Sequence, residues 1–198
     1  MKSNFLTRND KPLALAFILL SLMFLLLSFT NKGFFQWAFE RHQNQLSWYI
    51  RPLFLIPYCV FAYRRSLSGI FCTLFLLLTS MLWFPKPDVV SEQVTAFLQM
   101  EQDYLTGEWT RLKVLITLIV PLSLTILAVA FWKRSLWFGI AVLVFIAVAK
   151  MLWSVVFGGE SGQAIIAPAI IGLLVCIALL FFGVRRQERK KAKNTAQG

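Results

Sequence analysis

The chain has 198 residues, of which 58% are hydrophobic, and it contains 19 Phe, 7 Trp and a formal charge of +11. A soluble core of this length cannot bury that much apolar surface, and the mean hydropathy of +0.68 excludes an ordinary water-soluble domain. The sequence predicts an all-α polytopic membrane protein, with residues 1–198 forming one integral membrane domain. The basic charge is accounted for by topology, so nucleic acid is not an expected partner.

Six apolar runs have about the 20 residues needed to cross about 30 Å of hydrocarbon. We expect transmembrane helices at residues 13–30, 46–63, 67–84, 112–132, 136–157 and 164–184. The second run is the weakest, because Arg51, Pro52 and Pro57 interrupt it. It spans only if Arg51 is drawn below the membrane surface.

Lys and Arg residues fall mainly on one side of this topology. The termini and connections on that side carry thirteen positive and two negative residues, whereas the other side carries seven of each. Because positively charged short loops resist translocation, we expect both termini in the cytoplasm, most simply at a bacterial inner membrane. The basic tail at residues 185–198 is expected to attract anionic lipids at the cytoplasmic face.

The first outer connection, residues 31–45, is rich in aromatic residues and amphipathic at helical spacing, which predicts a helix in the outer interface. It contains His42, the one histidine of the sequence, beside Glu40 and Arg41, and we treat these three as secondary site candidates. Imidazole titrates near neutral pH, so His42 can be a proton carrier. An interfacial histidine bonded to backbone or water is the commoner case, and no ligand spacing around it indicates a metal.

Two hairpins resemble each other in sequence. Residues 61–83 and 130–153 share an aromatic end, a basic pair followed by Ser-Leu, a Gly-Ile pair and a Met-Leu-Trp end, with one inserted residue. This pattern indicates a parallel duplication of spans two and three in spans four and five, and chance similarity of Leu-rich helices is the alternative. In a duplication, Lys150 occupies the place of Ser80.

Residues 84–113 form the long polar interval between the two hairpins. A second interfacial helix is expected over residues 88–106, capped by Asp88 or Ser91 and ended by Gly107. Its apolar residues share one face, so it is predicted to lie on the membrane or over the mouth of the bundle.

Glu101 projects near the centre of that apolar face, where a carboxylate must find a cation, become protonated or open the face. Arg51 and Lys150 lie at a matching depth in their spans. We expect an Arg51–Glu101 pair first and solute binding second, while Lys150 can also snorkel beside Trp153. The candidate outer-face binding and charge cluster comprises Arg51, Glu101, Arg111, Lys150 and Glu160.

Residues Gly159-Glu160-Ser161-Gly162 resemble the GxSG signature of rhomboid intramembrane proteases over four positions. That family places a histidine on a later helix, whereas no histidine follows Ser161 here. The sequence therefore favours a short turn in which Ser161 caps the sixth helix.

Three functions remain open from the sequence. In the first, the outer charges bind or translocate a small polar or anionic solute or a lipid headgroup. In the second, they pair with each other in an accessory or assembly subunit. In the third, they serve an enzyme that acts on a lipid-linked substrate at the outer face. No catalytic residue, metal or cofactor is predicted, because the spans lack acidic pairs and known catalytic motifs. A homo-oligomer or a partner membrane subunit is a further expectation, since one chain has few polar residues with which to line a pore.

Overall fold

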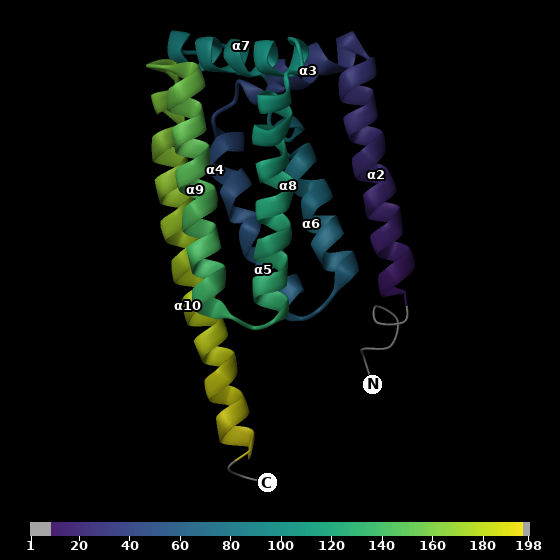
Figure 1. Ribbon diagram of the computed structural model, residues 1–198, viewed down its shortest axis with the longest axis vertical. Coiled ribbons are helices and arrows are strands. Elements are labelled where there is room, and N and C mark those ends of the chain that lie inside the picture. The colour runs from purple at the N-terminus through teal and green to yellow at the C-terminus, as the bar shows by residue number, and fades with distance from the viewer. Residues whose placement is uncertain (1–8, 196–198) are drawn as a thin grey trace.

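The computed structural model describes residues 9–195, which form a helical bundle without strands in that range (Figure 1). Within it, four helical segments are long and apolar enough to cross a membrane. These are α2 (Asp10–Thr30), α8 (Arg111–Trp132), α9 (Leu136–Gly158) and the segment Ser161–Gly183, which joins η2 (Ser161–Ile165) to the first part of α10 (Ile166–Thr195). The predicted all-helical class is confirmed. The ends of the predicted basic face, residues 1–8 and 196–198, lie outside the described residues.

The second and third expected spans are shorter than the sequence predicts. The second divides at Phe54 into α4 (Leu46–Leu53) and α5 (Leu55–Tyr63). Proline supplies no amide N–H to the helix ladder, so Pro57 leaves the carbonyl of Leu53 without its helical partner at this break.

The third expected span is also reduced. It consists of α6 (Leu67–Thr79) and the single turn η1 (Ser80–Leu82), and it ends before Pro85. Leu67–Leu82 is therefore a shorter apolar helix rather than a fifth segment of full membrane length.

Two amphipathic helices lie across one end of the bundle, which we call the capped end (Figure 1). They are α3 (Lys32–His42) and α7 (Glu92–Thr106). As the sequence predicts, the Ser91 side chain accepts the Val94 N–H and Gly107 follows the last helical residue. The apolar face of α7 turns into the bundle, where Val94, Phe97 and Leu98 are buried.

The core has two parts. A central cluster joins α5, α8, α9 and α10 through residues such as Tyr58, Leu127 and Leu143, and a second cluster packs α7 onto Trp48 and Ile165. Most other apolar side chains of the long helices face outward. That exposure fits a bundle surrounded by lipid, since hydrocarbon imposes no penalty on such surface.

The two resembling hairpins turn with the same backbone geometry. Arg65 and Arg134 both have φ 59°, and in each turn the next N–H bonds the carbonyl five residues back, at 3.0 and 2.9 Å. Both helices thus end in a Schellman motif, with arginine in the left-handed position that glycine usually occupies. Past each turn, Gly69 and Gly139 lie tightly against a phenylalanine of the preceding helix, where a Cβ would overlap the ring.

Asp10 anchors α2 to α6 at the other end of the bundle. Its carboxylate accepts the N–H groups of Leu67 and Ser68 at 2.9 and 3.0 Å and the hydroxyls of Ser66 and Ser68 at 3.0 and 2.6 Å. A carboxylate at a helix N-terminus satisfies the free amides there and is favoured by the helix dipole. This contact of Asp10 is not among those predicted from the sequence.

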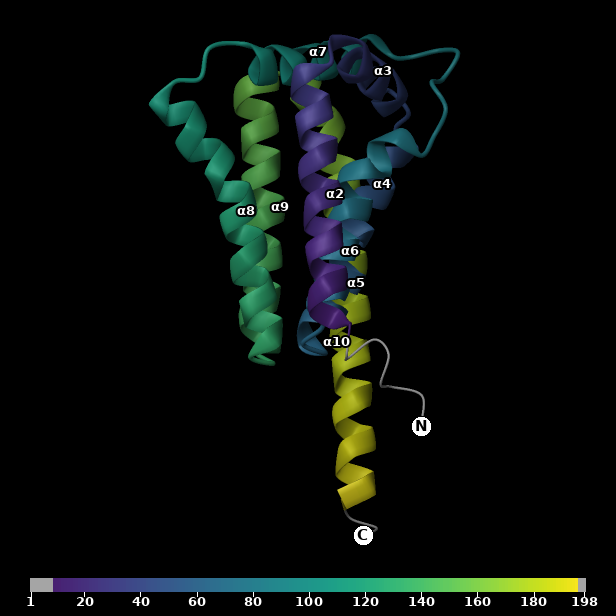
Figure 2. The same ribbon diagram turned by 90° about the vertical axis from the view of Figure 1, so that its right-hand side faces the viewer.

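Helix α8 packs against the bundle over only half of its length. Leu127 is fully buried, yet Val120, two turns earlier on the same face, is 60% exposed. Pro121 lies within α8 between them, and Figure 2 shows α8 leaning away from α9 towards the capped end. The bundle is therefore tight at the end with the hairpin turns and splayed towards the capped end.

Candidate functional site

Four polar side chains from four helices meet beneath α7. They are His42 from α3, Arg51 from α4, Glu101 from α7 and Lys150 from α9, and we call them the charge cluster. Lys150 Nζ lies 2.9 Å from Glu101 Oε1, His42 Nε2 lies 4.0 Å from Glu101 Oε2, and Arg51 Nη1 lies 3.1 Å from His42 Nε2. The structure thus brings three residues of the predicted outer-face cluster, Arg51, Glu101 and Lys150, together with the secondary candidate His42.

Glu101 and Lys150 reach each other from opposite directions. Glu101 follows the buried Phe97 and Leu98 by one helical turn, so the same face of α7 directs its carboxylate inward. Lys150 lies eight residues before the end of α9, about 12 Å below it along the axis. Its stem extends towards α7, and Nζ lies 4.5 Å from the ring centroid of Trp153. The predicted snorkelling of Lys150 and its cation–π contact with Trp153 are both present. The ammonium group also pairs with the Glu101 carboxylate.

Hydrogen bonds around His42 fix its tautomer. The Ser47 hydroxyl donates to the Asn44 carbonyl at 2.8 Å, so Ser47 Oγ is left to accept a proton from His42 Nδ1 at 3.0 Å. Nε2 is then free to accept from Arg51 at 3.1 Å. The ring is neutral and held on both sides, and the indole N–H of Trp48 bonds the His42 carbonyl at 3.0 Å.

The electrostatics agree with this arrangement. Burial, followed by the charge of Arg51, lowers the pKa of His42 to about 3, so the ring is neutral near pH 7. Burial raises the pKa of Glu101, but the charge and hydrogen bond of Lys150 together with His42 and Arg51 outweigh burial, so the pKa is lowered overall and the carboxylate stays ionised. One negative and two positive groups leave the charge cluster with a net charge of +1.

Arg51 holds the unmatched charge. Among the described residues its side chain makes one hydrogen bond, to the neutral His42, and no carboxylate lies within 4.0 Å of it. The expected Arg51–Glu101 ion pair is therefore not formed, because Glu101 pairs with Lys150. A partly buried guanidinium with free N–H groups is suited to binding an anion.

Acid should destabilise the fold through His42. Because its folded pKa lies below the usual 6.5, the unfolded chain binds the extra proton, and stability present above pH 6.5 is lost as the pH falls towards 3. Between pH 7 and pH 5 we expect a loss of about 2 kcal/mol. The charged groups that face the ring are Arg51, Glu101 and Lys150. Thermal unfolding in detergent at both pH values measures the loss, and a His42→Gln variant should flatten the dependence; an equal dependence in both proteins would assign it elsewhere.

The remaining sequence candidates lie outside the charge cluster. Glu40 pairs with Lys86 at 3.6 Å on exposed surface, and Arg41 donates to the Leu82 carbonyl at 2.7 Å. Arg111 is exposed at the first residue of α8. Glu160 contributes its backbone carbonyl, which accepts from Gln93 at 3.0 Å.

Ser47 and Trp48 are site residues that the sequence analysis did not identify. Both are buried, and both bond His42 across the turn between α3 and α4. The polar run at residues 43–45 is the signal that could have indicated this return of the chain.

Ser161 does not take the predicted capping role. The N-cap of η2 is Glu160 without a side-chain cap bond, and the Ser161 hydroxyl donates back to the Gly158 carbonyl at 2.7 Å. The serine of the rhomboid-like motif is thus engaged with the end of α9, while the histidine is bonded to Ser47.

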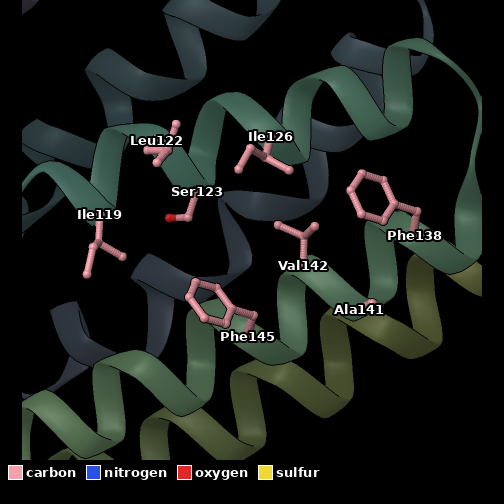
Figure 3. Close-up of a pocket in the computed structure, with 8 residues that line it drawn as sticks. All are labelled: Ile119, Leu122, Ser123, Ile126, Phe138, Ala141, Val142 and Phe145. Atoms are coloured by element: carbon pink, nitrogen blue, oxygen red, sulfur yellow. The ribbon is translucent and has the colours of Figure 1, made fainter.

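An apolar groove lies between α8 and α9 (Figure 3). It has a volume of about 430 Å³ and is walled by residues such as Ile119 and Ile126 on α8 and Phe138 and Phe145 on α9. The single hydroxyl in its wall, Ser123, is bonded to the Val120 carbonyl at 2.9 Å. The groove therefore offers hydrocarbon contact and no polar recognition.

No protein family, no curated protein and no solved structure matches the chain. Within residues 9–195, no three His, Cys, Asp or Glu side chains gather as metal ligands would. The charge cluster holds one ion pair, between Lys150 and Glu101, and one guanidinium, Arg51, that has no carboxylate partner among the described residues.

Proposed function

We propose that this protein binds an anion, either a small solute or the headgroup of a lipid, at the charge cluster. The observation that carries the proposal is the unmatched guanidinium of Arg51 in a partly buried cluster of net charge +1. A guanidinium has five N–H donors and binds carboxylate or phosphate in bidentate fashion. Away from bulk water, such a charge attracts an anion more strongly than it does at an open surface.

The proposed topology has six spans with both termini in the cytoplasm of a bacterial inner membrane. In it, α4 with α5 forms the broken second span and α6 with η1 the short third one, and the charge cluster lies on the outer face. The distribution of Lys and Arg supports this orientation. At the α4–α5 break the Cys176 thiol of α10 donates to the Pro52 carbonyl at 3.2 Å, and such a contact supports a broken span, since irregular backbone in a membrane must be shielded from lipid.

A parallel duplication of the hairpins is part of the same proposal. The matching left-handed turns at Arg65 and Arg134, each followed by a glycine against a phenylalanine, support it. In this alignment the second copy carries Lys150 where the first carries the buried Ser80. The anion site would then have arisen on one of two equivalent hairpins.

Arg51→Gln tests the anion proposal. Loss of a charge-assisted hydrogen bond is worth about 1.5–3 kcal/mol, so we expect affinity for inorganic phosphate to fall by about tenfold or more. Isothermal titration calorimetry on the whole chain in uncharged detergent measures it. Lys86→Gln is the matched control, because it removes one exposed positive charge at the same end of the bundle. Equal affinity of the Arg51→Gln variant and the native chain, or no binding by the native chain, rejects the proposal.

A second candidate is an accessory or assembly subunit. The 2.9 Å Lys150–Glu101 ion pair favours it, because both charges are satisfied within the chain and tie α7 to α9. In that case Arg51→Gln changes stability or complex formation while no anion binds to the native protein.

A further inference from the structure

Access to the charge cluster from the capped end is closed. Helix α7 lies over it, and Val94, Phe97 and Leu98 on the inner face of that helix are at most 2% exposed. The Phe97 ring packs edge-on against Trp48, with centroids 5.6 Å apart, and His42 is 5% exposed. A solute arriving from water above α7 meets a packed apolar layer.

Access from the side is open. The Lys150 side chain is 44% exposed, although its residue lies about 12 Å below the end of α9. Surface that is exposed at such a depth faces between helices and towards hydrocarbon rather than through α7. Helix α8 is splayed at a comparable depth, where Val120, on the face that carries the buried Leu127, is 60% exposed. Figure 2 shows the same separation of α8 from α9 towards the capped end.

The apolar groove lies deeper along the same pair of helices. Phe145, at its upper wall, precedes Lys150 by five residues, or about 7.5 Å along α9. The groove and Lys150 lie on different faces of α9, so a flexible chain attached to a group at Lys150 has to bend around that helix to enter the groove. A charged group above and a hydrocarbon slot below match the two ends of a lipid.

We infer that the ligand of the charge cluster is an anionic amphiphile that enters sideways from the membrane between α8 and α9. Its phosphate or carboxylate binds at Arg51 and Lys150, and an acyl chain lies in the groove of Figure 3. The inference rests on the proposed anion binding and adds the class of ligand and its route. A free ion would leave the groove unoccupied, and a neutral lipid would leave the charge of Arg51 without a counter-ion.

The test compares two probes on the whole, delipidated chain in uncharged detergent. Native mass spectrometry gives the affinity for phosphatidylglycerol, and calorimetry gives that for inorganic phosphate. Ala141→Trp fills the groove from α9, and Ile126→Trp fills it from α8. Val156→Trp is the control, because Val156 is 74% exposed on α9 and does not line the groove. We expect the two groove variants to bind phosphatidylglycerol at least about tenfold more weakly with unchanged phosphate affinity, and the control to behave as the native chain.

The outcomes separate the inference from the proposal beneath it. If phosphate binds and phosphatidylglycerol binds no more tightly, the ligand is a free anion and the inference fails while anion binding stands. If neither probe binds, both fail. If phosphatidylglycerol binds tightly and both groove variants leave it unchanged, the acyl chain lies elsewhere and the assigned groove is wrong.

Discussion

Lys150→Met should lower the free energy of unfolding by about 1–3 kcal/mol. The substitution keeps the stem in place and leaves the ionised Glu101, which is 18% exposed, without its 2.9 Å partner under α7. Removing one member of a fully buried ion pair costs about 3–5 kcal/mol, and the partial exposure of Lys150 reduces that figure. Reversible unfolding in mixed micelles at pH 7 measures the change.

A double-mutant cycle separates pairing from packing. Glu101→Gln removes the carboxylate, so the double variant with Lys150→Met should be more stable than the sum of the single effects predicts, by about 1 kcal/mol or more. Lys86→Met is the surface control: its pair with Glu40 is 3.6 Å long and about half exposed on both sides, which implies a cost of at most about 1 kcal/mol. An additive cycle, or a Lys150→Met cost no larger than that of the control, would show that the ion pair does not hold α7 to α9.

Glu101 illustrates what the sequence can predict about this site. Its inward direction follows from helical geometry alone, because the apolar face of α7 is set by residues three and four positions away. The depths of Arg51 and Lys150 also follow from their distance along each helix. The choice of partner depends on how four helices are placed in space, and neither spacing nor composition contains that information. The packing of α9 against α7 therefore makes Lys150, rather than the predicted Arg51, the partner of Glu101.

Local signals explain the helices that were predicted well. Ser91 and Gly107 mark the ends of α7 through backbone chemistry that acts within one turn. The division of the second span at Phe54 depends on which backbone groups the neighbouring helices satisfy. The anchoring of Asp10 on α6 joins residues more than fifty positions apart. A short window of sequence predicts neither the division of the second span nor the anchor at Asp10, although Pro57 indicates a weak point in that span.

Gly162→Ala should destabilise the protein by about 3 kcal/mol or prevent folding. A Cβ at this position would overlap the carbonyl group of Ser154 and lie 3.0 Å from the amide nitrogen of Val155, all backbone atoms of α9. Overpacking usually costs about 1–3 kcal/mol, and here the obstacle is a helix backbone that cannot change rotamer. Thermal unfolding of the purified variant in detergent, with expression level as a second readout, measures the effect.

The destabilisation caused by Gly162→Ala should extend to the charge cluster, because η2 packs against α7. Ile165 packs in the same core cluster as Val94 and Phe97, and Gln93 bonds the carbonyl of Glu160 at 3.0 Å. Gly183→Ala is the matched control, because no atom lies within 4 Å of a Cβ there and alanine favours the helix by about 1 kcal/mol. Equal stability of the two alanine variants would mean that η2 does not lie against α9 as described. The double-mutant cycle of Lys150 and Glu101 can be repeated in the Gly162→Ala background. Loss of the coupling energy there would show that the close approach of η2 to α9 positions the Glu101 carboxylate over Lys150.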